Sequence, residues 1–139
     1  MFVIGPEYAT AREIALKLLE TCRVAAEPLT STDLAHGPVA ALDPMFPVWA
    51  IASDDVTLPA ITEAAVRVRA AGATLVASGT AASAIEGADY SLAVPGPSVP
   101  LLAPILSVVP GQLFALALAR AKGLDPDVPR GLTKVTLAR

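Results

Sequence analysis

Residues 47–77 read PVWAIASDDVTLPAITEAAVRVRAAGATLVA, and this stretch decides the expected fold. It begins with a short apolar run, residues 47–52, which predicts a buried strand. A helix is then expected from Leu58-Pro59 up to Gly72, because proline suits the first turn of a helix and glycine its end. The next apolar run, residues 73–77, predicts another strand. Buried strands joined by a helix are typical of a parallel sheet that helices cover on both faces.

The same alternation continues on both sides of this stretch. Short apolar or extended runs are expected at residues 2–4, 24–28 and 90–94, and longer helical patterns at residues 7–22 and 100–122. The last helix should be kinked or restarted at Pro104 and Pro110. Hydroxyl residues at 31–34 are expected to cap a short helix. The sequence therefore predicts an α/β fold, a three-layer α/β/α sandwich with a mostly parallel sheet of four to five strands.

Composition narrows the class of protein. Ten Lys plus Arg and thirteen Asp plus Glu give 139 residues a net charge of −3, which argues against an electrostatic nucleic-acid binder. Hydrophobic residues make up 54% and charged residues 17%, so the chain is expected to fold. A single cysteine, Cys22, cannot form an internal disulfide, and one histidine makes a zinc site unexpected. We expect one cytoplasmic domain with no metal and no cofactor.

One stretch is long enough to raise the question of a membrane. Positions 90–119 hold no charged residue, but five prolines interrupt them. Arg120 and Lys122 follow soon after. We therefore expect the helix there to be a buried helix of a soluble protein. The high apolar content also indicates that a partner covers part of the surface, and a homodimer is the simplest symmetric arrangement.

Few residues offer catalytic chemistry. His36 is the only histidine and could move a proton near neutral pH, although its place beside a Gly-Pro pair also fits a surface loop. Glu13, Lys17 and Glu20 recur at i, i+4 and i+7 on one helix face, where a solvated row of ion pairs is the simpler interpretation. Lys134 fits either a tail lysine or one that forms a Schiff base with a carbonyl substrate.

Two turns that follow predicted strands are the places to look for a phosphate site, which needs backbone amides or hydroxyls. Ser53-Asp54-Asp55 has two carboxylates, which would repel phosphate. Ser78-Gly79-Thr80 is chemically permissive, but capping is the commoner role of such residues.

Ordered motifs along the chain resemble one family. They are residues 13–21 (EIALKLLET), 26–28 (AEP), 36–38 (HGP), 103–105 (API), 109–113 (VPGQL), 123–127 (GLDPD) and 129–136 (PRGLTKVT). Together they are similar to the C-terminal half of the isomerase region of glucosamine-6-phosphate synthases, that is, to the second sugar isomerase (SIS) subdomain. The resemblance covers nearly the whole chain. It implies a single SIS domain over residues 1–139, with the tail 123–139 completing the active-site region.

The resemblance also implies roles for five residues. Glu20 falls at the carboxylate that moves a proton between C1 and C2 of a hexose 6-phosphate. His36 falls at the residue that assists opening of the sugar ring and reaches the active site of the neighbouring subunit. Lys134 matches the lysine that forms an imine with the ketose carbonyl. Glu13 and Lys17 match polar residues that line the substrate site and support the carboxylate.

The sequence departs from the family pattern at several points. The glycine-rich turn after the first strand is shortened to Gly5-Pro6-Glu7, and Leu19 and Asp33 stand where lysine and glutamate are common. The first SIS subdomain, whose Ser/Thr-rich turns hold the sugar phosphate, and the glutaminase domain, which supplies nitrogen, have no counterpart in these residues. Unaided catalysis is therefore not expected.

Two functions stay open at this point. The first is a sugar-phosphate-binding SIS domain of a ketose/aldose phosphate isomerase or a glutamine–fructose-6-phosphate aminotransferase of amino sugar metabolism. It would interconvert fructose 6-phosphate and an (amino)hexose 6-phosphate by an imine or enediol-type proton transfer, with a second SIS half. The alternative is a non-catalytic sugar-phosphate-binding or regulatory SIS module. The expected partners are fructose 6-phosphate or glucosamine 6-phosphate and a second copy, SIS half or glutaminase half, without nucleic acid or membrane.

Overall fold

A single parallel sheet forms the centre of the structure, a computed structural model that describes residues 1–131. Its five strands lie in the order β2-β1-β3-β4-β5, and every neighbouring pair is parallel. The strands are β1 (Phe2–Ile4), β2 (Glu27–Leu29), β3 (Pro47–Ile51), β4 (Thr74–Gly79) and β5 (Tyr90–Ala93). The mostly parallel sheet expected from the sequence is confirmed.

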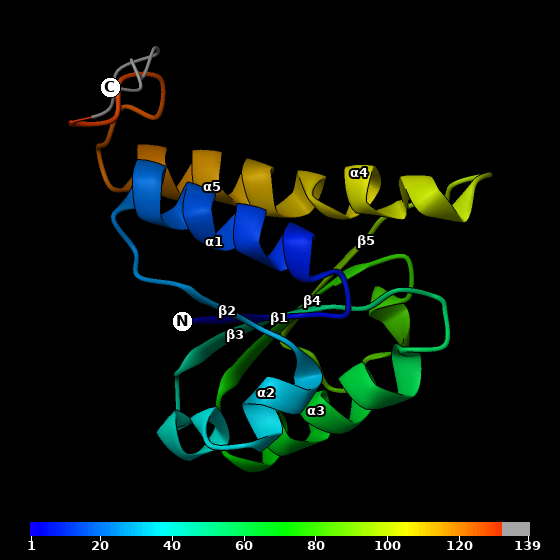
Figure 1. Ribbon diagram of the computed structural model, residues 1–139. Helices are drawn as coiled ribbons and strands as arrows, with labels where there is room; N and C mark the ends of the chain where they lie inside the picture. The colour runs from blue at the N-terminus through cyan, green and yellow to red at the C-terminus, as the bar shows by residue number, and fades with distance from the viewer. Residues whose placement is uncertain (132–139) are drawn as a thin grey trace, which may run out of the picture.

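Helices cover both faces of this sheet (Figure 1). On one face lie α1 (Tyr8–Cys22), α4 (Ala103–Ser107) and α5 (Val109–Ala121), and on the other lie α2 (Ser31–Ala35) and α3 (Leu58–Ala70). Residues 1–131 also contain three short 3-10 turns: η1 (Pro38–Ala41), η2 (Ala82–Ala84) and η3 (Pro100–Leu102). The arrangement is the expected three-layer α/β/α sandwich.

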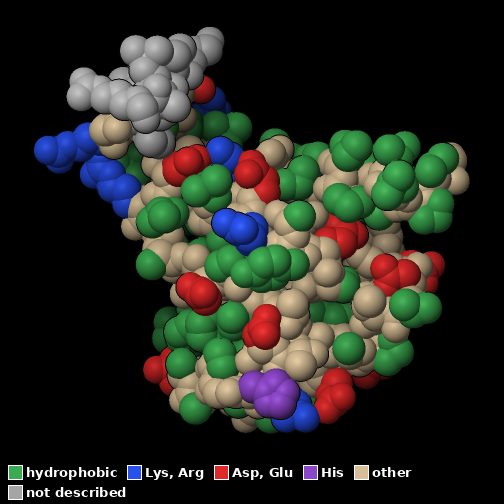
Figure 2. Space-filling model, in the orientation of Figure 1, with side chains coloured by type: hydrophobic (Ala, Val, Ile, Leu, Met, Phe, Trp, Pro, Cys, Tyr) green, Lys and Arg blue, Asp and Glu red, His purple; other side chains and the backbone are tan. Residues whose placement is uncertain are grey.

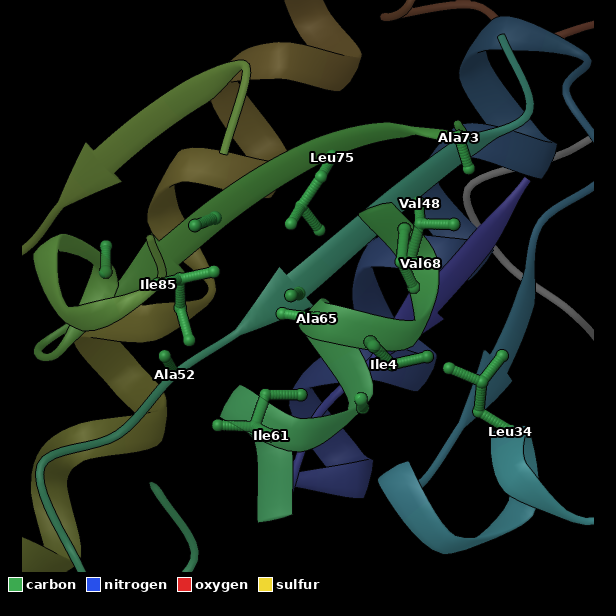
Figure 3. Close-up of a cluster of buried hydrophobic side chains, with 14 of the residues drawn as sticks. Ile4, Leu34, Val48, Ala52, Ile61, Ala65, Val68, Ala73, Leu75 and Ile85 are labelled. Atoms are coloured by element: carbon green, nitrogen blue, oxygen red, sulfur yellow. The ribbon is translucent and has the colours of Figure 1, made fainter. Parts of the chain in front are cut away.

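Alternating side chains of the strands build two cores. On the α2–α3 face, Ile4, Val48 and Leu75 pack with Leu34 and Val68 (Figure 3). On the α1–α5 face, the side chains of Val3, Trp49 and Ile51 pack against those of Ile14, Leu18 and Ala115. Because the central strands are buried on both faces, they are apolar throughout rather than alternating, as the sequence shows.

The cap of α2 differs from the expected one. Thr30, rather than a hydroxyl within residues 31–34, is the N-cap, and its Oγ1 accepts a hydrogen bond from the Asp33 backbone N–H at 3.0 Å. The Asp33 carboxylate accepts in return from the Thr30 backbone N–H at 3.0 Å. This capping box satisfies donors at the start of a helix too short to be stable by itself.

The segment 100–121 departs from the expectation of a buried helix. It is one run of helix long and apolar enough to cross a membrane by length and composition, with a mean hydropathy of 2.0. Only 17% of the most apolar window is buried. The helix restarts at Pro104 and Pro110, as expected. Within the described residues, its buried positions are Ser107, Gly111, Ala115 and Ala119, on the side that faces α1 and the sheet.

Candidate functional site

Three of the predicted site residues lie together on α1. Lys17 Nζ is 2.8 Å from Glu20 Oε2 and 3.8 Å from Glu13 Oε1, so one ammonium group joins two carboxylates along a single helix face. Their side chains are about one-third exposed: 37% for Glu13, 34% for Lys17 and 27% for Glu20. The predicted shared face is confirmed, and all three heads are open to a ligand.

The charge of Lys17 is secured by its neighbours. The hydrogen bond to Glu20 is the main cause that raises the pKa of Lys17 above its ordinary value, against a smaller opposing effect of burial. Lys17 is therefore a fixed cation at neutral pH. A cation held between two carboxylates can pin the direction in which the carboxylates point while leaving their outer oxygens free to accept a proton.

A groove runs beside this cluster, between α1 and the chain leading into β2. It has a volume of about 470 Å³ and is lined by Ala9, Arg12, Glu13, Ala15, Leu16, Leu19, Ala26 and Pro28. Of the three clustered residues, Glu13 lines the groove directly. Leu19, which stands where the family commonly has lysine, supplies an apolar wall instead of a second cation.

His36 lies on the other side of the sheet. It is the C-cap of α2, its backbone N–H donates to the Asp33 carbonyl at 3.1 Å, and its side chain is exposed. The histidine, purple in Figure 2, sits at the end of the molecule away from the helices α1, α4 and α5. Glu20 and His36 are 16 positions apart, and strand β2 lies between them in the chain. Because β2 carries the chain from one face of the sheet to the other, the two residues lie on opposite faces.

Lys134 lies outside the described residues. The chain that leads to it leaves α5 beside the C-terminal end of α1, where Lys122 Nζ donates to the Cys22 carbonyl at 2.7 Å. Leu124 packs against the core on that side. Glu20 belongs to the last turn and a half of α1, so residues 122–124 lie at the same end of the helix.

A carboxylate that the sequence did not single out lies at the usual ligand position of this fold. In a sheet of order 2-1-3-4-5, ligands bind beyond the carboxyl ends of β1 and β3, where the chain direction switches. Here Glu7, just after β1, accepts hydrogen bonds from Ser53 Oγ, just after β3, at 2.8 Å and from Thr10 Oγ1 at 3.0 Å. Ser107 Oγ of α4 lies 3.5 Å from the same carboxylate.

The hydrogen bonds from Ser53 and Ser107 to the Glu7 carboxylate, which we call the Glu7 tie, make this position unsuitable for phosphate. Glu7, Asp54 and Asp55 put three carboxylates at the switch point, and the two buried hydroxyls of Ser53 and Ser107 already donate to Glu7. An anion there would meet like charge and no free donor among these groups. The expected failure of residues 53–55 to bind phosphate thus has a structural basis, which only the pairing of distant segments reveals.

The second turn, Ser78-Gly79-Thr80, serves the fold. The hydroxyl of Ser78 is buried and accepts a hydrogen bond from Trp49 Nε1 at 2.7 Å. Thr80 Oγ1 accepts from the Asp54 backbone N–H at 2.9 Å. Both hydroxyls therefore act in packing and capping, the commoner role. Within residues 1–131, no group of three or more His, Cys, Asp or Glu side chains could hold a metal ion.

Comparisons with known proteins agree on the fold and its family. The family model described as SIS domain matches residues 2–121. The glutamine–fructose-6-phosphate aminotransferase (isomerizing) of Leifsonia xyli subsp. xyli is 39% identical over 134 residues, which cover 91% of this chain and 21% of that protein. The corresponding protein of Gloeobacter violaceus is 40% identical over 132 residues, 94% of this chain and 22% of its own length. The chain thus spans about one-fifth of these relatives.

A solved structure gives the same picture. The C-terminal domain of glucosamine-fructose-6-phosphate aminotransferase from Francisella tularensis superposes with a TM-score of 0.78 at 28% identity, covering 89% of this chain and 36% of that one. Tagatose-6-phosphate ketose/aldose isomerase from Escherichia coli, at 22% identity and a TM-score of 0.76, shares the fold over 99% of this chain and 40% of its own.

Proposed function

Because this chain belongs to the SIS domain family, we propose that it is the part of a sugar-phosphate isomerase or isomerizing aminotransferase that carries the proton-transfer residues. The substrate is fructose 6-phosphate or an aminohexose 6-phosphate, and phosphate binding comes from a second SIS half. The observation that carries the proposal is the Glu13–Lys17–Glu20 cluster beside an open groove.

Each residue has a defined task in this proposal. Glu20 takes the proton from the carbon next to the carbonyl and delivers it to the former carbonyl carbon, so that it moves between C1 and C2, because a positioned carboxylate can act as both base and acid. Lys17 holds the Glu20 carboxylate in place, and Glu13 borders the groove in which the sugar would lie. Lys134, in the tail 123–139 that we propose completes the site, would form the imine that acidifies the carbon-bound proton.

His36 would serve a different copy of the site. It is on the face of the sheet opposite α1, so its task in ring opening requires the neighbouring subunit of a homodimer. We propose accordingly that the working form is an assembly, with either a second copy or a separate SIS or glutaminase half. We also propose that this assembly is soluble and lies in the cytoplasm, because the apolar helix 100–121 packs against α1 through Ala115 and Ala119, and insertion into a bilayer would lose this packing.

The alternative, a non-catalytic binding or regulatory module, is not favoured by the comparisons. The relatives that match at 39% and 40% identity are both named as isomerizing aminotransferases. A module that only binds sugar phosphate would have no use for a carboxylate, an amine and an imidazole together.

A thermal-shift titration tests the proposal. We expect fructose 6-phosphate and glucosamine 6-phosphate to raise the Tm of the protein saturably, because a ligand that binds only the folded state stabilises it by mass action. Glu20→Gln should reduce the rise, while Arg67→Met, which removes a similar ion pair on α3, should keep it. An equal rise in Glu20→Gln would contradict the role proposed for Glu20, whereas no rise at about 10 mM would mean that the sugar phosphate binds only when the second SIS half is present.

A further inference from the structure

The groove beside α1 contains a cation that forms no ion pair with another described residue. Three ion pairs occur within residues 1–131, and their cations are Lys17, which takes part in two, and Arg67. Arg12 takes part in none of them, although its side chain lines the groove. Most exposed arginines only keep a surface hydrated, so the surroundings of Arg12 decide whether it has a further role.

The walls of this groove have the composition of a small-molecule site. Six of its eight lining residues are apolar, and the other two are Arg12 and Glu13. Leu16 and Leu19 are 44% and 55% exposed on the α1 side. Ligand sites are hollows of about 300–1,000 Å³ with mostly apolar walls and a few polar groups that orient the ligand. A groove of about 470 Å³ with one guanidinium and one carboxylate fits this description.

The strand beside the groove does not favour a peptide as the ligand. β2 is an edge of the sheet, where an extended peptide could pair with free backbone groups. The Glu27 N–H donates to the Met1 carbonyl at 3.0 Å, and the Leu29 carbonyl accepts from the N–H of residue 5 at 3.2 Å. Residues 27 and 29 therefore bond inward to β1, and position 28 faces outward. Pro28 has no N–H to donate there, so a small molecule fits the groove better than an added strand.

The charges around the groove allow an anion to reach Arg12. Glu13 is the carboxylate that lines the groove, and Lys17 Nζ lies 3.8 Å from it. Arg12, Glu13, Lys17 and Glu20 together carry no net charge at neutral pH, so an anion meets no excess of like charge among them. Glu27 points to the other face of the sheet, because strand side chains alternate and its neighbours at 26 and 28 line the groove.

We propose that Arg12 binds the phosphate group of the sugar phosphate that lies in this groove. The inference rests on the proposed function for its ligand, and it adds a cation of this chain to a phosphate site otherwise assigned to a second SIS half. The two turns expected to suit phosphate are otherwise engaged, at residues 53–55 by carboxylates and at 78–80 by packing and capping. A guanidinium offers paired N–H groups that match two phosphate oxygens, which makes arginine well suited to this task.

The spacing along α1 suits a ligand of this length. Arg12 and Glu20 lie on one helix with a separation of about 12 Å along its axis. Long helical side chains lean toward the N-terminus, so the two charged groups keep about the same separation. A hexose 6-phosphate has its phosphate at the opposite end from its carbonyl carbon. Its C1 and C2 can therefore lie at Glu20 while its phosphate lies at Arg12, and the carbon chain between them passes the exposed Leu16.

NMR titration of the purified ¹⁵N-labelled chain tests the proposal. Phenyl phosphate supplies a phosphate and an apolar ring without a ketose, fructose 6-phosphate supplies the proposed ligand, and fructose lacks the phosphate. Both phosphates should shift the backbone N–H signals of residues 12–19 saturably, with a Kd on the order of 1–10 mM, and fructose should not. The same spectra show whether each variant is folded.

Four variants separate Arg12 from a general effect of charge. Arg12→Met should raise the Kd of both phosphates at least about tenfold, because the charge-assisted hydrogen bonds are lost, and Arg12→Lys should raise it less. Arg67→Met removes the same charge from α3 and should leave the Kd unchanged. Leu19→Lys added to Arg12→Met should recover part of the loss, because position 19 lines the same groove.

Several outcomes would overturn the proposal. They are no shift of residues 12–19 by either phosphate at about 10 mM, binding of phenyl phosphate without fructose 6-phosphate, equal loss in Arg12→Met and Arg67→Met, and shifts confined to residues 53–55 and 78–80. Failure of the proposed function gives a different result. Both phosphates then bind through Arg12, while Glu20→Gln leaves the affinity for fructose 6-phosphate unchanged.

Discussion

Gly111 of α5 lies directly against Ile14 of α1, so that a methyl group in place of its hydrogen would overlap the Ile14 side chain. The close approach of these two helices rests on that missing methyl group. Gly111→Ala should therefore destabilise the protein by about 1–3 kcal/mol through overpacking, although alanine is the better helix former by about 1 kcal/mol. Urea unfolding followed by Trp49 fluorescence measures the difference.

The neighbouring position provides the control for this substitution. Gln112 is exposed on the same turn of α5, so Gln112→Ala changes the helix without touching α1. It should alter the free energy of unfolding by no more than about 0.5 kcal/mol. If Gly111→Ala stabilised the protein as helix propensity alone requires, the packing of α5 on α1 would have to be looser than the structure shows.

A buried hydrogen bond joins the two central strands β3 and β4. Trp49 Nε1 donates to Ser78 Oγ at 2.7 Å, and both side chains are fully buried. Ser78→Ala leaves the indole N–H without this acceptor, which should cost about 1–3 kcal/mol of unfolding free energy. Ser91→Ala, on the exposed strand β5, should cost less than about 0.5 kcal/mol. Equal effects of the two substitutions would contradict this role of Ser78.

Much of the fold could be predicted from local pattern. Apolar runs mark β1, β3, β4 and β5, and an extended run at 24–28 marks the region of β2. The prolines at 104 and 110 mark the restarts of the last helix, because each of these signals lies within one element. What covers a helix is not a local property. The composition of residues 100–121 is the same whether the helix is buried or exposed, so the sequence could not distinguish the two. The prediction of a buried helix was therefore wrong.

In the candidate site, too, contacts within one helix could be predicted from the sequence, and contacts between distant segments could not. The spacing of Glu13, Lys17 and Glu20 sets them on one face of α1, and the salt bridges confirm it. The tie between Glu7 and Ser53 joins residues 46 positions apart, and it exists only because β1 and β3 are neighbours in the sheet. The separation of Glu20 from His36 likewise depends on β2 passing along the edge of the sheet, which no spacing in the sequence indicates.

The Glu7 tie predicts a stability effect across three elements. Glu7→Ala removes the acceptor of Ser53 and Ser107, whose hydroxyls are buried, and should lower the unfolding free energy by about 1–3 kcal/mol. Glu7→Gln keeps a carbonyl oxygen and should cost less. Chemical denaturation of both variants checks the order. A larger loss in Glu7→Gln than in Glu7→Ala would contradict the tie.

The capping box of α2 predicts a pH dependence. The backbone N–H of Thr30, and next its hydroxyl, lower the pKa of Asp33. A carboxylate whose pKa is lower in the folded state adds stability above its unfolded pKa, and that stability is lost as pH falls below about 4. Asp33→Asn should therefore lower Tm at pH 7, and the difference from the parent chain should shrink toward pH 3. For Thr32→Val, a change at an exposed position of the same helix, the difference in Tm from the parent chain should not shrink toward pH 3.

Lys17 and Arg67 allow structure and function to be separated. Both lie in the second half of a helix, and each forms an ion pair with a glutamate of the same helix. Lys17 lies 2.8 Å from Glu20, and Arg67 lies 2.7 Å from Glu63. Exposed pairs of this kind contribute about 0.5 kcal/mol or less, so Lys17→Met and Arg67→Met should change unfolding free energy equally little. Because the pKa of Lys17 is raised, its share of stability is present at neutral pH and is lost only as pH rises through that raised value.

Under the proposed function, Lys17→Met alone should abolish most of the Tm rise given by fructose 6-phosphate, since Glu20 then loses the group that holds it. Titration calorimetry of the two variants with the same sugar phosphate checks this, and equal affinity in both would remove Lys17 from the site.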